Sequence, residues 1–188
     1  NGGKTIERLL YLDPATGKEK WRAVGESAAY ASFIVAKLGG VTQLVGYDKE
    51  SLGGWDLKNG QRLWTVKAEN NGDFNVGTPV VVGERLLVST ENNGTRLLQF
   101  GKDGVADPKP VAKSDDLSLD MGTPVLWKGR AYATRGGLYC INADDDMKTA
   151  WSDEKEDGFS AYSACIAGND RLMVFGESGV LCLVDISG

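Results

Sequence analysis

A short stretch that runs from an aspartate to a tryptophan constrains the fold of this chain more than any other feature, because it recurs. The first copy is DPATGKEKW, from Asp13 to Trp21, and the second is DLKNGQRLW, from Asp56 to Trp64, 43 residues further on. A looser copy, NADDDMKTAW, runs from Asn142 to Trp151, and an abbreviated VDISG occupies residues 184–188. A period of this length indicates one supersecondary unit repeated in series, such as a propeller blade or a solenoid turn.

The segments between these turns have the pattern of short β-strands. No segment keeps a sustained 3.6-residue apolar period, so the sequence predicts essentially no long helix. The clearest unit contains the apolar runs TPVVV, RLLVST and TRLLQF, separated by turns at residues 83–84 and 91–94. The second turn contains Asn93-Gly94, a pair that accepts the positive φ of a tight hairpin. Short apolar runs joined by such turns are typical of an all-β fold.

A hydroxyl residue opens the first strand of each predicted unit and forms a second landmark. These residues are Ser32, Thr78, Thr123 and Ser163, at spacings of 46, 45 and 40 residues. Proline follows Thr78 and Thr123, where it can start a strand without removing a ladder donor. The two landmarks repeat in step, which favours a repeat architecture. Segment 101–113 loses the pattern, and its two prolines suit an edge strand.

We therefore predict an all-β fold, a β-propeller built from four-stranded antiparallel blades. The chain supplies about four to five blades: two strands of a first blade, three full blades and three strands of a fifth. The expected repeat units, within a single propeller domain or a portion of one, are residues 1–24, 25–67, 68–113, 114–154 and 155–188. Because the sequence begins and ends within a repeat, we expect it to be part of a larger propeller of seven or eight blades.

Charge and cysteine usage limit the classes of partner. The net charge is −5, and the lysines and arginines are scattered, so the basic patch that nucleic acid requires is missing. No apolar run is long enough to insert into a membrane, and the first residues lack the pattern of a signal peptide. The three cysteines, at 140, 165 and 182, have no CxxC spacing, and the chain contains no histidine. We expect these cysteines to be small apolar residues on strands, with at most one disulfide.

The repeat resembles that of a known family. The phrase L-D-x-x-T-G-K-x-x-W at residues 12–21 and the strand phrases GTPVVVGERLLVST and GTPVLWKGRAYAT are similar to the quinoprotein-type, or PQQ-like, β-propeller repeat. That family includes quinone-dependent alcohol dehydrogenases, the lipoprotein that assists outer-membrane barrel assembly, and bacterial propellers of unassigned function. The resemblance covers nearly the whole chain and weakens over residues 101–120. The chain resembles the propellers of the barrel-assembly lipoprotein type more than the quinone-dependent dehydrogenases. It implies a bacterial protein located outside the cytoplasm, periplasmic or secreted.

The aspartate, glycine and tryptophan that recur in the repeated turn each have a structural role that explains their recurrence. An aspartate can hydrogen-bond the backbone that follows it, and a glycine supplies the positive φ of the turn. The resemblance implies that each indole docks between neighbouring blades, where an apolar crevice with a nearby carbonyl suits its one N–H donor. The residues expected to dock blades in this way are Asp13, Gly17, Trp21, Asp56, Gly60, Trp64, Asn142 and Trp151.

The sequence offers no catalytic constellation. The resemblance implies that a quinone enzyme would need a Ca²⁺ site, a catalytic aspartate, a tryptophan platform and often adjacent cysteines. This chain has no adjacent cysteines, no CxxCH, and no histidine for a Ser-His-Asp triad. The acidic run at 144–146 lacks the glycine and glutamate of a Ca²⁺ loop, which favours a solvated turn. We therefore predict no catalytic, cofactor-binding or metal-binding residue, and the sequence favours a non-enzyme.

One face remains a candidate for binding. In a propeller the first strand of each blade lines the central channel, and the loops that enter these strands share one face. Small hydroxyls on that face are expected to pack the channel wall rather than to recognise a ligand. The candidate binding residues are Tyr30, Ser32, Phe74, Asn75, Thr78, Met121, Thr123, Tyr162 and Ser163.

Two functional hypotheses follow from these observations. The first is a non-catalytic propeller that acts as a protein-interaction or ligand-sensing scaffold, with a protein partner whose identity the sequence leaves open. The alternative is a fragment of a quinone-dependent alcohol or sugar dehydrogenase, whose catalytic residues would lie in other blades. Repetition of a motif establishes a fold, but one fold hosts many functions.

Overall fold

The structure is a computed structural model of the chain and describes residues 8–144 and 146–188. Within these residues every regular element is a β-strand, and no helix is long and apolar enough to cross a membrane. The strands form five antiparallel sheets, which we number blade 1 to blade 5 in chain order. Blades 2, 3 and 4 have four strands each, blade 1 has two and blade 5 has three.

The strands of each blade follow one another in chain order. Blade 1 consists of β1 (Arg8–Leu12) and β2 (Glu19–Val24). Blade 2 consists of β3 (Ile34–Leu38), β4 (Val41–Tyr47), β5 (Ser51–Trp55) and β6 (Arg62–Lys67). Blade 3 consists of β7 (Val80–Val82), β8 (Arg85–Thr90), β9 (Gly94–Leu98) and β10 (Ala112–Ser114). Blade 4 consists of β11 (Val125–Trp127), β12 (Arg130–Thr134), β13 (Leu138–Asn142) and β14 (Thr149–Asp153). Blade 5 consists of β15 (Ser163–Gly168), β16 (Arg171–Gly176) and β17 (Leu181–Asp185).

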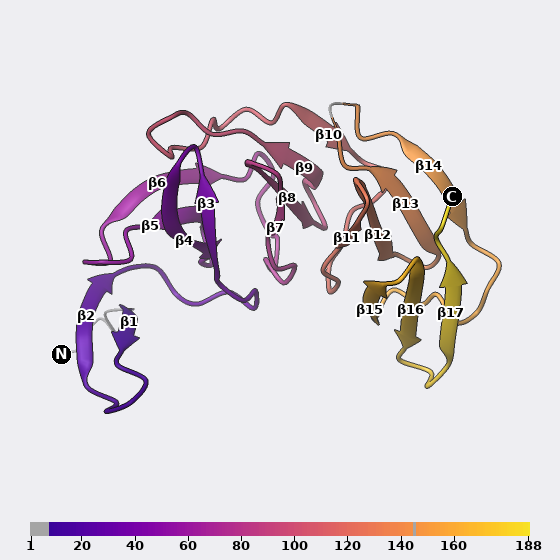
Figure 1. The fold of residues 1–188 in the computed structure, drawn as a ribbon, viewed down its shortest axis with the longest axis horizontal. Helices are drawn as coiled ribbons and strands as arrows, with labels where there is room; N and C mark the ends of the chain where they lie inside the picture. Colours follow the sequence, from indigo (N-terminus) through magenta and orange to yellow (C-terminus); the bar gives the residue numbers. More distant parts are fainter. Residues whose placement is uncertain (1–7, 145) are drawn as a thin grey trace.

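The blades lie side by side along an arc, with the two ends of the chain at opposite ends of it (Figure 1). In the three complete blades, the first strand lies on the concave side of the arc and the last strand on the convex side. The predicted all-β propeller of four-stranded antiparallel blades is therefore confirmed. That the chain is part of a larger propeller stays a prediction.

The core consists of three apolar clusters, each between two successive blades. Blades 2 and 3 share the first cluster, blades 3 and 4 the second, and blades 4 and 5 the third. Side chains alternate across a strand, so Leu86 and Val88 of β8 point toward blade 2 while Leu87, between them, points toward blade 4. Both faces of a central strand are therefore buried, and every residue of β9 and all but the first residue of β8 are buried.

The repeated turn has the same backbone bonds in its first two copies. The N–H of Gly17 donates to the carbonyl of Asp13, and the N–H of Gly60 donates to that of Asp56, both at 2.8 Å. The aspartate side chain accepts hydrogen bonds from the N–H groups that follow it. Both glycines have positive φ, 67° and 72°. In the third copy Met147 takes positive φ instead (43°) and is buried in the cluster between blades 3 and 4.

The tryptophans that end these turns lie between blades. The indole N–H of Trp21 donates to the carbonyl of Leu57 in blade 2 at 2.9 Å. Trp64 is 6% exposed, donates to the Gln43 side-chain oxygen at 2.6 Å, and packs its ring 5.5 Å from that of Phe100. Trp151 is half-buried against the cluster shared by blades 4 and 5. The indoles thus contribute to the packing of one blade on the next.

The three cysteines lie on strands. Cys140 of β13 is fully buried, and Cys165 and Cys182 are half-buried in blade 5. All three are free thiols. Burial raises the pKa of Cys165 to about 11 and also raises the pKa of Cys140 and Cys182. Thiolates are therefore disfavoured at neutral pH, which suits a packing role rather than a reactive one.

Candidate functional site

The exposed aromatic and methionine side chains of the predicted channel face lie in the connections that lead into successive blades. Tyr30 precedes β3, Phe74 precedes β7, Met121 precedes β11 and Tyr162 directly precedes β15. Their exposed fractions are large, from 46% for Tyr162 to 75% for Tyr30. Most large apolar side chains elsewhere are used between blades, so this group requires another explanation.

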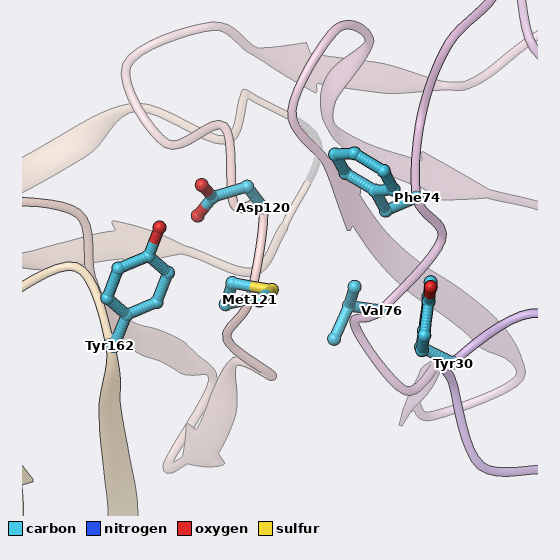
Figure 2. Close-up of a pocket in the computed structure, with 6 residues that line it drawn as sticks. All are labelled: Tyr30, Phe74, Val76, Asp120, Met121 and Tyr162. Carbon is cyan, nitrogen blue, oxygen red and sulfur yellow. The ribbon is translucent and has the colours of Figure 1, made fainter. Parts of the chain in front are cut away.

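These connections enclose a cavity of about 300 Å³, which we call the channel-face cleft; it is lined by Tyr30, Phe74, Val76, Asp120, Met121 and Tyr162. Figure 2 shows Tyr162 and Asp120 on one side, Tyr30 and Phe74 on the other, and Val76 and Met121 between them. The rings of Tyr30 and Phe74 meet edge to face, with centroids 6.4 Å apart. The cleft is therefore apolar in its middle and aromatic at its sides, with one carboxylate.

A backbone hydrogen bond joins the two connections that carry the aromatic pair, Tyr30 and Phe74. The N–H of Ala31 donates to the carbonyl of Asn75 at 3.0 Å, which links the residues next to Tyr30 and Phe74. Asn75 is 6% exposed, has a φ of 55°, and donates its side-chain amide to the carbonyls of Asp48 and Lys49 at 3.2 and 3.3 Å. Because Asn tolerates the left-handed region better than most residues, it can both make this turn and anchor it on blade 2.

The four hydroxyl residues at the predicted strand openings take part in hydrogen bonds within and between the connections that lead into the blades. The N–H of Ser32 donates to Thr78 Oγ1 at 3.2 Å, and the N–H of Thr78 donates to Thr123 Oγ1 at 3.0 Å. Ser163 Oγ donates to the carbonyl of Ser160 at 2.8 Å. The hydroxyls of Thr78 and Thr123 therefore connect one blade to the next, and that of Ser163 closes a local turn. None of the four residues lines the cleft.

The structure divides the sequence-predicted face into two groups. Tyr30, Phe74, Met121 and Tyr162 line the cleft, whereas Asn75 and the four hydroxyl residues support its walls. The sequence reasoning missed Val76 and Asp120. Tyr30, Val76 and Met121 each lie two residues before the hydroxyl that opens a strand, so the repeat register was the signal that could have found Val76.

Asp120 differs from the other acidic groups near the blades. It is half-buried, and no hydrogen bond or ion pair joins it to any residue that the structure describes. By contrast, Asp48 is paired with Arg62 at 2.5 Å, Asp170 with Lys128 at 2.5 Å, and Asp185 with Arg171 at 2.8 Å. The cleft thus contains a negative charge that is not neutralised from within the described chain.

One buried cation lies between blades 2 and 3. Arg96 is 9% exposed and donates to Thr90 Oγ1 at 3.0 Å and to the hydroxyl of Tyr47 at 3.3 Å. Burial raises the pKa of Tyr47 to about 12, although the neighbouring Arg96 opposes this shift. The phenol is therefore neutral at physiological pH and has a packing role.

The acidic run at residues 144–146, for which the sequence predicts a solvated turn, is described only in part. Residue 145 of the run at 144–146 lies outside the described residues, and Asp146 is exposed and paired with Lys148 at 3.1 Å. Among residues 8–144 and 146–188, no group of three or more Cys, Asp or Glu side chains is arranged to hold a metal ion. The channel-face cleft contains a single carboxylate, that of Asp120.

The blades and their repeated turns define a β-propeller of the PQQ-like repeat class. Residues 3–152 match the sequence profile of the outer membrane protein assembly factor BamB family. Because this match spans most of the chain, the chain belongs to that family. The predicted resemblance to the PQQ-like repeat, and within it to the barrel-assembly propellers, is confirmed, and the dehydrogenase alternative is not favoured.

Solved structures agree on the fold. The crystal structure of BamB from Moraxella catarrhalis is 15% identical, with a TM-score of 0.56 over 96% of this chain and 68% of that one. The computationally designed Ika4 protein is 12% identical, with a TM-score of 0.66 over 92% of this chain and 100% of that one. The designed Ika8 protein is 12% identical, with a TM-score of 0.68 over 93% of this chain and 51% of that one. No curated protein matches the sequence.

Proposed function

We propose that this chain is a non-catalytic scaffold that binds a protein partner at the channel-face cleft, outside the cytoplasm of a bacterium. The observation that carries the proposal is the group of exposed side chains, Tyr30, Phe74, Met121 and Tyr162, that four successive blades direct to one cavity. Membership of the assembly-factor family supports both the interaction role and the extracytoplasmic location.

The shape of the cleft favours a protein partner over a small metabolite. Small-molecule sites bury 70–90% of their ligand in a concave pocket, whereas Tyr30 and Phe74 here are 75% and 62% exposed. Tyrosine and methionine are enriched at protein interfaces, because they supply large apolar contact area and can adapt their shape. A protruding side chain or loop of a partner would cover these rings on binding.

The rings are also held ready for contact. The link between Ala31 and Asn75, and the hydrogen bond of 2.6 Å from the N–H of Phe74 to Glu91 Oε1, fix the backbone at both aromatic residues. A surface that is ordered before binding loses less conformational entropy when it binds. This order distinguishes the cleft from scattered exposed apolar residues, which are normal on any protein surface.

A site-specific cross-linking experiment tests the proposal. A photoreactive phenylalanine analogue replaces Phe74 in the cleft or, as the control, Val105, which is 39% exposed and lies outside the cleft. Each variant is expressed in a bacterial host that exports it, and its adducts are identified by mass spectrometry. We expect one discrete protein adduct from position 74 that position 105 does not give. The same diffuse pattern from both positions would contradict the proposal.

A further inference from the structure

We infer that the channel-face cleft recognises a lysine or arginine side chain of its partner, presented by an otherwise apolar segment. The inference rests on the proposed function and specifies its chemistry. Its first support is Asp120, whose half-buried carboxylate has no cation partner among the described residues. The six lining residues include no lysine or arginine, so the cation must come from outside the cleft.

The three rings supply a second attraction for a cation. Tyr30 and Phe74 lie opposite Tyr162 and Asp120 across the cavity (Figure 2). A cation close to the face of an aromatic ring is attracted electrostatically by the ring quadrupole. Aromatic rings around one carboxylate therefore favour an ammonium or guanidinium group over a neutral or acidic one.

The same chemistry already exists inside the chain. The guanidinium carbon of Arg62 lies 4.2 Å from the centroid of the Trp55 ring, and its Nη1 lies 2.5 Å from Asp48 Oδ2. There a ring and a carboxylate together hold one cation. The described residues that line the cleft supply rings and a carboxylate but no lysine or arginine.

The middle of the cleft suits the aliphatic part of such a side chain. Val76 and Met121 lie between the aromatic pair and Asp120 (Figure 2). Lysine and arginine bury their methylene stems on apolar surface while the charged end reaches a polar group. The thioether of Met121 adapts to either stem.

The surrounding charge disfavours an acidic segment. Glu91 accepts the N–H of Phe74 through Oε1, and its buried Oε2 has no hydrogen-bond partner among the residues that the structure describes. The chain as a whole carries a net charge of −5. A basic partner segment would therefore be attracted before contact, and this attraction would weaken with added salt.

The test uses three synthetic peptides that differ at one position: Ac-Gly-Leu-Lys-Leu-Gly-amide, the same peptide with norleucine, and the same peptide with glutamate. Norleucine keeps the aliphatic stem of lysine and removes its ammonium group. Binding to the ¹⁵N-labelled 188-residue chain is followed by NMR. We expect the lysine peptide to shift the amide signals of Tyr30, Phe74 and Met121, with an affinity about 10-fold higher than that of norleucine.

Two variants complete the test. Asp120→Asn should remove most of the preference for lysine and leave the affinity for the norleucine peptide unchanged, because it removes charge without changing size. Glu84→Gln, in the exposed turn between β7 and β8, makes the same charge change outside the cleft and should keep the preference.

The outcomes separate the two proposals. Equal affinity for lysine and norleucine, or a lysine preference that survives Asp120→Asn, overturns this inference and leaves the binding role of the cleft intact. Absence of any shift with all three peptides also overturns it. The proposed function itself fails only if position 74 gives no adduct distinct from the control.

Discussion

Blades 3 and 5 carry the same apolar pattern on the face that points toward the C-terminal end of the arc, and only blade 3 buries it. In blade 3 the cross-strand pair Leu87 and Leu97 is fully buried against blade 4. In blade 5 the corresponding pair, Met173 and Leu183, is 39% and 69% exposed. Leu87 and Met173 each lie two residues after the arginine that starts the second strand, so the register is the same. The exposure of Met173 and Leu183 reflects that no described blade packs against this face of blade 5, and not the residue type.

The exposed surface of blade 5 is continuous. Phe175 pairs with Leu181, and Ile166 pairs with Met173, so these side chains share one face of the sheet with Leu183. At the opposite end of the arc, blade 1 exposes Leu10, Leu12 and Val24; these two exposed faces form the ends of the stack (Figure 1).

The exposed side chains of the channel-face cleft differ from those of blade 5 in their place in the fold. Those of the cleft lie in connections, not on strand faces, so adding a blade to the stack would not account for them. The exposed face of blade 5 matches in register the face that blade 3 packs on blade 4, whereas Tyr30, Phe74 and Tyr162 lie on no such strand face. The predictions below test this division, beginning with the largest effect.

Trp64→Ala should lower the free energy of unfolding by about 3–5 kcal/mol, as expected for a buried aromatic residue in a core. The indole is 6% exposed, packs on Phe100 of the next blade, and satisfies the buried Gln43 side chain. Urea unfolding followed by circular dichroism measures the change. A loss below about 1 kcal/mol would mean that the indole does not hold blades 2 and 3 together.

The comparison between blades 3 and 5 predicts unequal effects of one substitution. Leu97→Ala should cost about 2–5 kcal/mol, because Leu97 is fully buried between two blades. Leu183→Ala, at the matching position, should cost less than about 1 kcal/mol, because its side chain is mostly exposed. Equal losses in the same urea titration would show that blade 5 is covered in solution.

The glycines of the repeated turn give a second matched pair. A Cβ at Gly60 would lie 2.5 Å from the Trp21 ring of blade 1, whereas a Cβ at Gly17 would meet nothing within 4 Å. Both positions have positive φ, so alanine at either costs about 1–2 kcal/mol. Gly60→Ala should cost a further 1–3 kcal/mol, roughly, because the ring must move. Thermal unfolding of the two variants measures the difference, and equal midpoints would contradict the docking of Trp21 on this turn.

Tyr47 makes stability depend on alkaline pH. Because burial raises its pKa in the folded chain from 10.0 to about 12, folding favours the protonated phenol. Its contribution is complete below pH 10 and is lost as the pH rises toward 12, a loss of about 2–3 kcal/mol. Urea midpoints at intervals from pH 9 to pH 12 should therefore fall more steeply for the natural chain than for Tyr47→Phe. Parallel curves would place the phenol in water.

Substitutions in the cleft should have the smallest effect on stability. Tyr30→Ser and Tyr162→Ser should each change the free energy of unfolding by less than about 1 kcal/mol, since both rings are largely exposed. A larger loss in urea unfolding would assign the rings to packing and remove the basis for a binding surface.

Much of the fold could be predicted from the sequence because the same pattern of apolar runs and turns recurs in successive repeats. The bounds of β8, Arg85–Thr90, are those of the apolar run RLLVST. β7 and β11 begin two residues later than the predicted openers Thr78 and Thr123, because these residues bond to neighbouring blades and not within a ladder. The segment that lost the repeat pattern contains only the short edge strand β10.

The cleft was predictable only in part. The position of Tyr30, Phe74 and Tyr162 before each strand opener follows from the repeat. The importance of Asp120 does not, because it depends on the lack of a partner in the folded chain, and no local pattern encodes that. The assignment of Asn75 to the supporting wall likewise depends on its contacts with blade 2, which are distant in sequence.

The most direct test of the distinction between the channel-face cleft and the exposed face of blade 5 uses two double variants. The quantity measured in each is the yield of the cross-linked adduct from position 74. Tyr30→Ser with Tyr162→Ser alters the cleft, and Leu181→Ser with Leu183→Ser alters the exposed face of blade 5 by a comparable loss of apolar surface. We predict that the cleft variant loses the adduct and that the blade 5 variant retains it. Retention in the cleft variant with loss in the blade 5 variant would contradict the account.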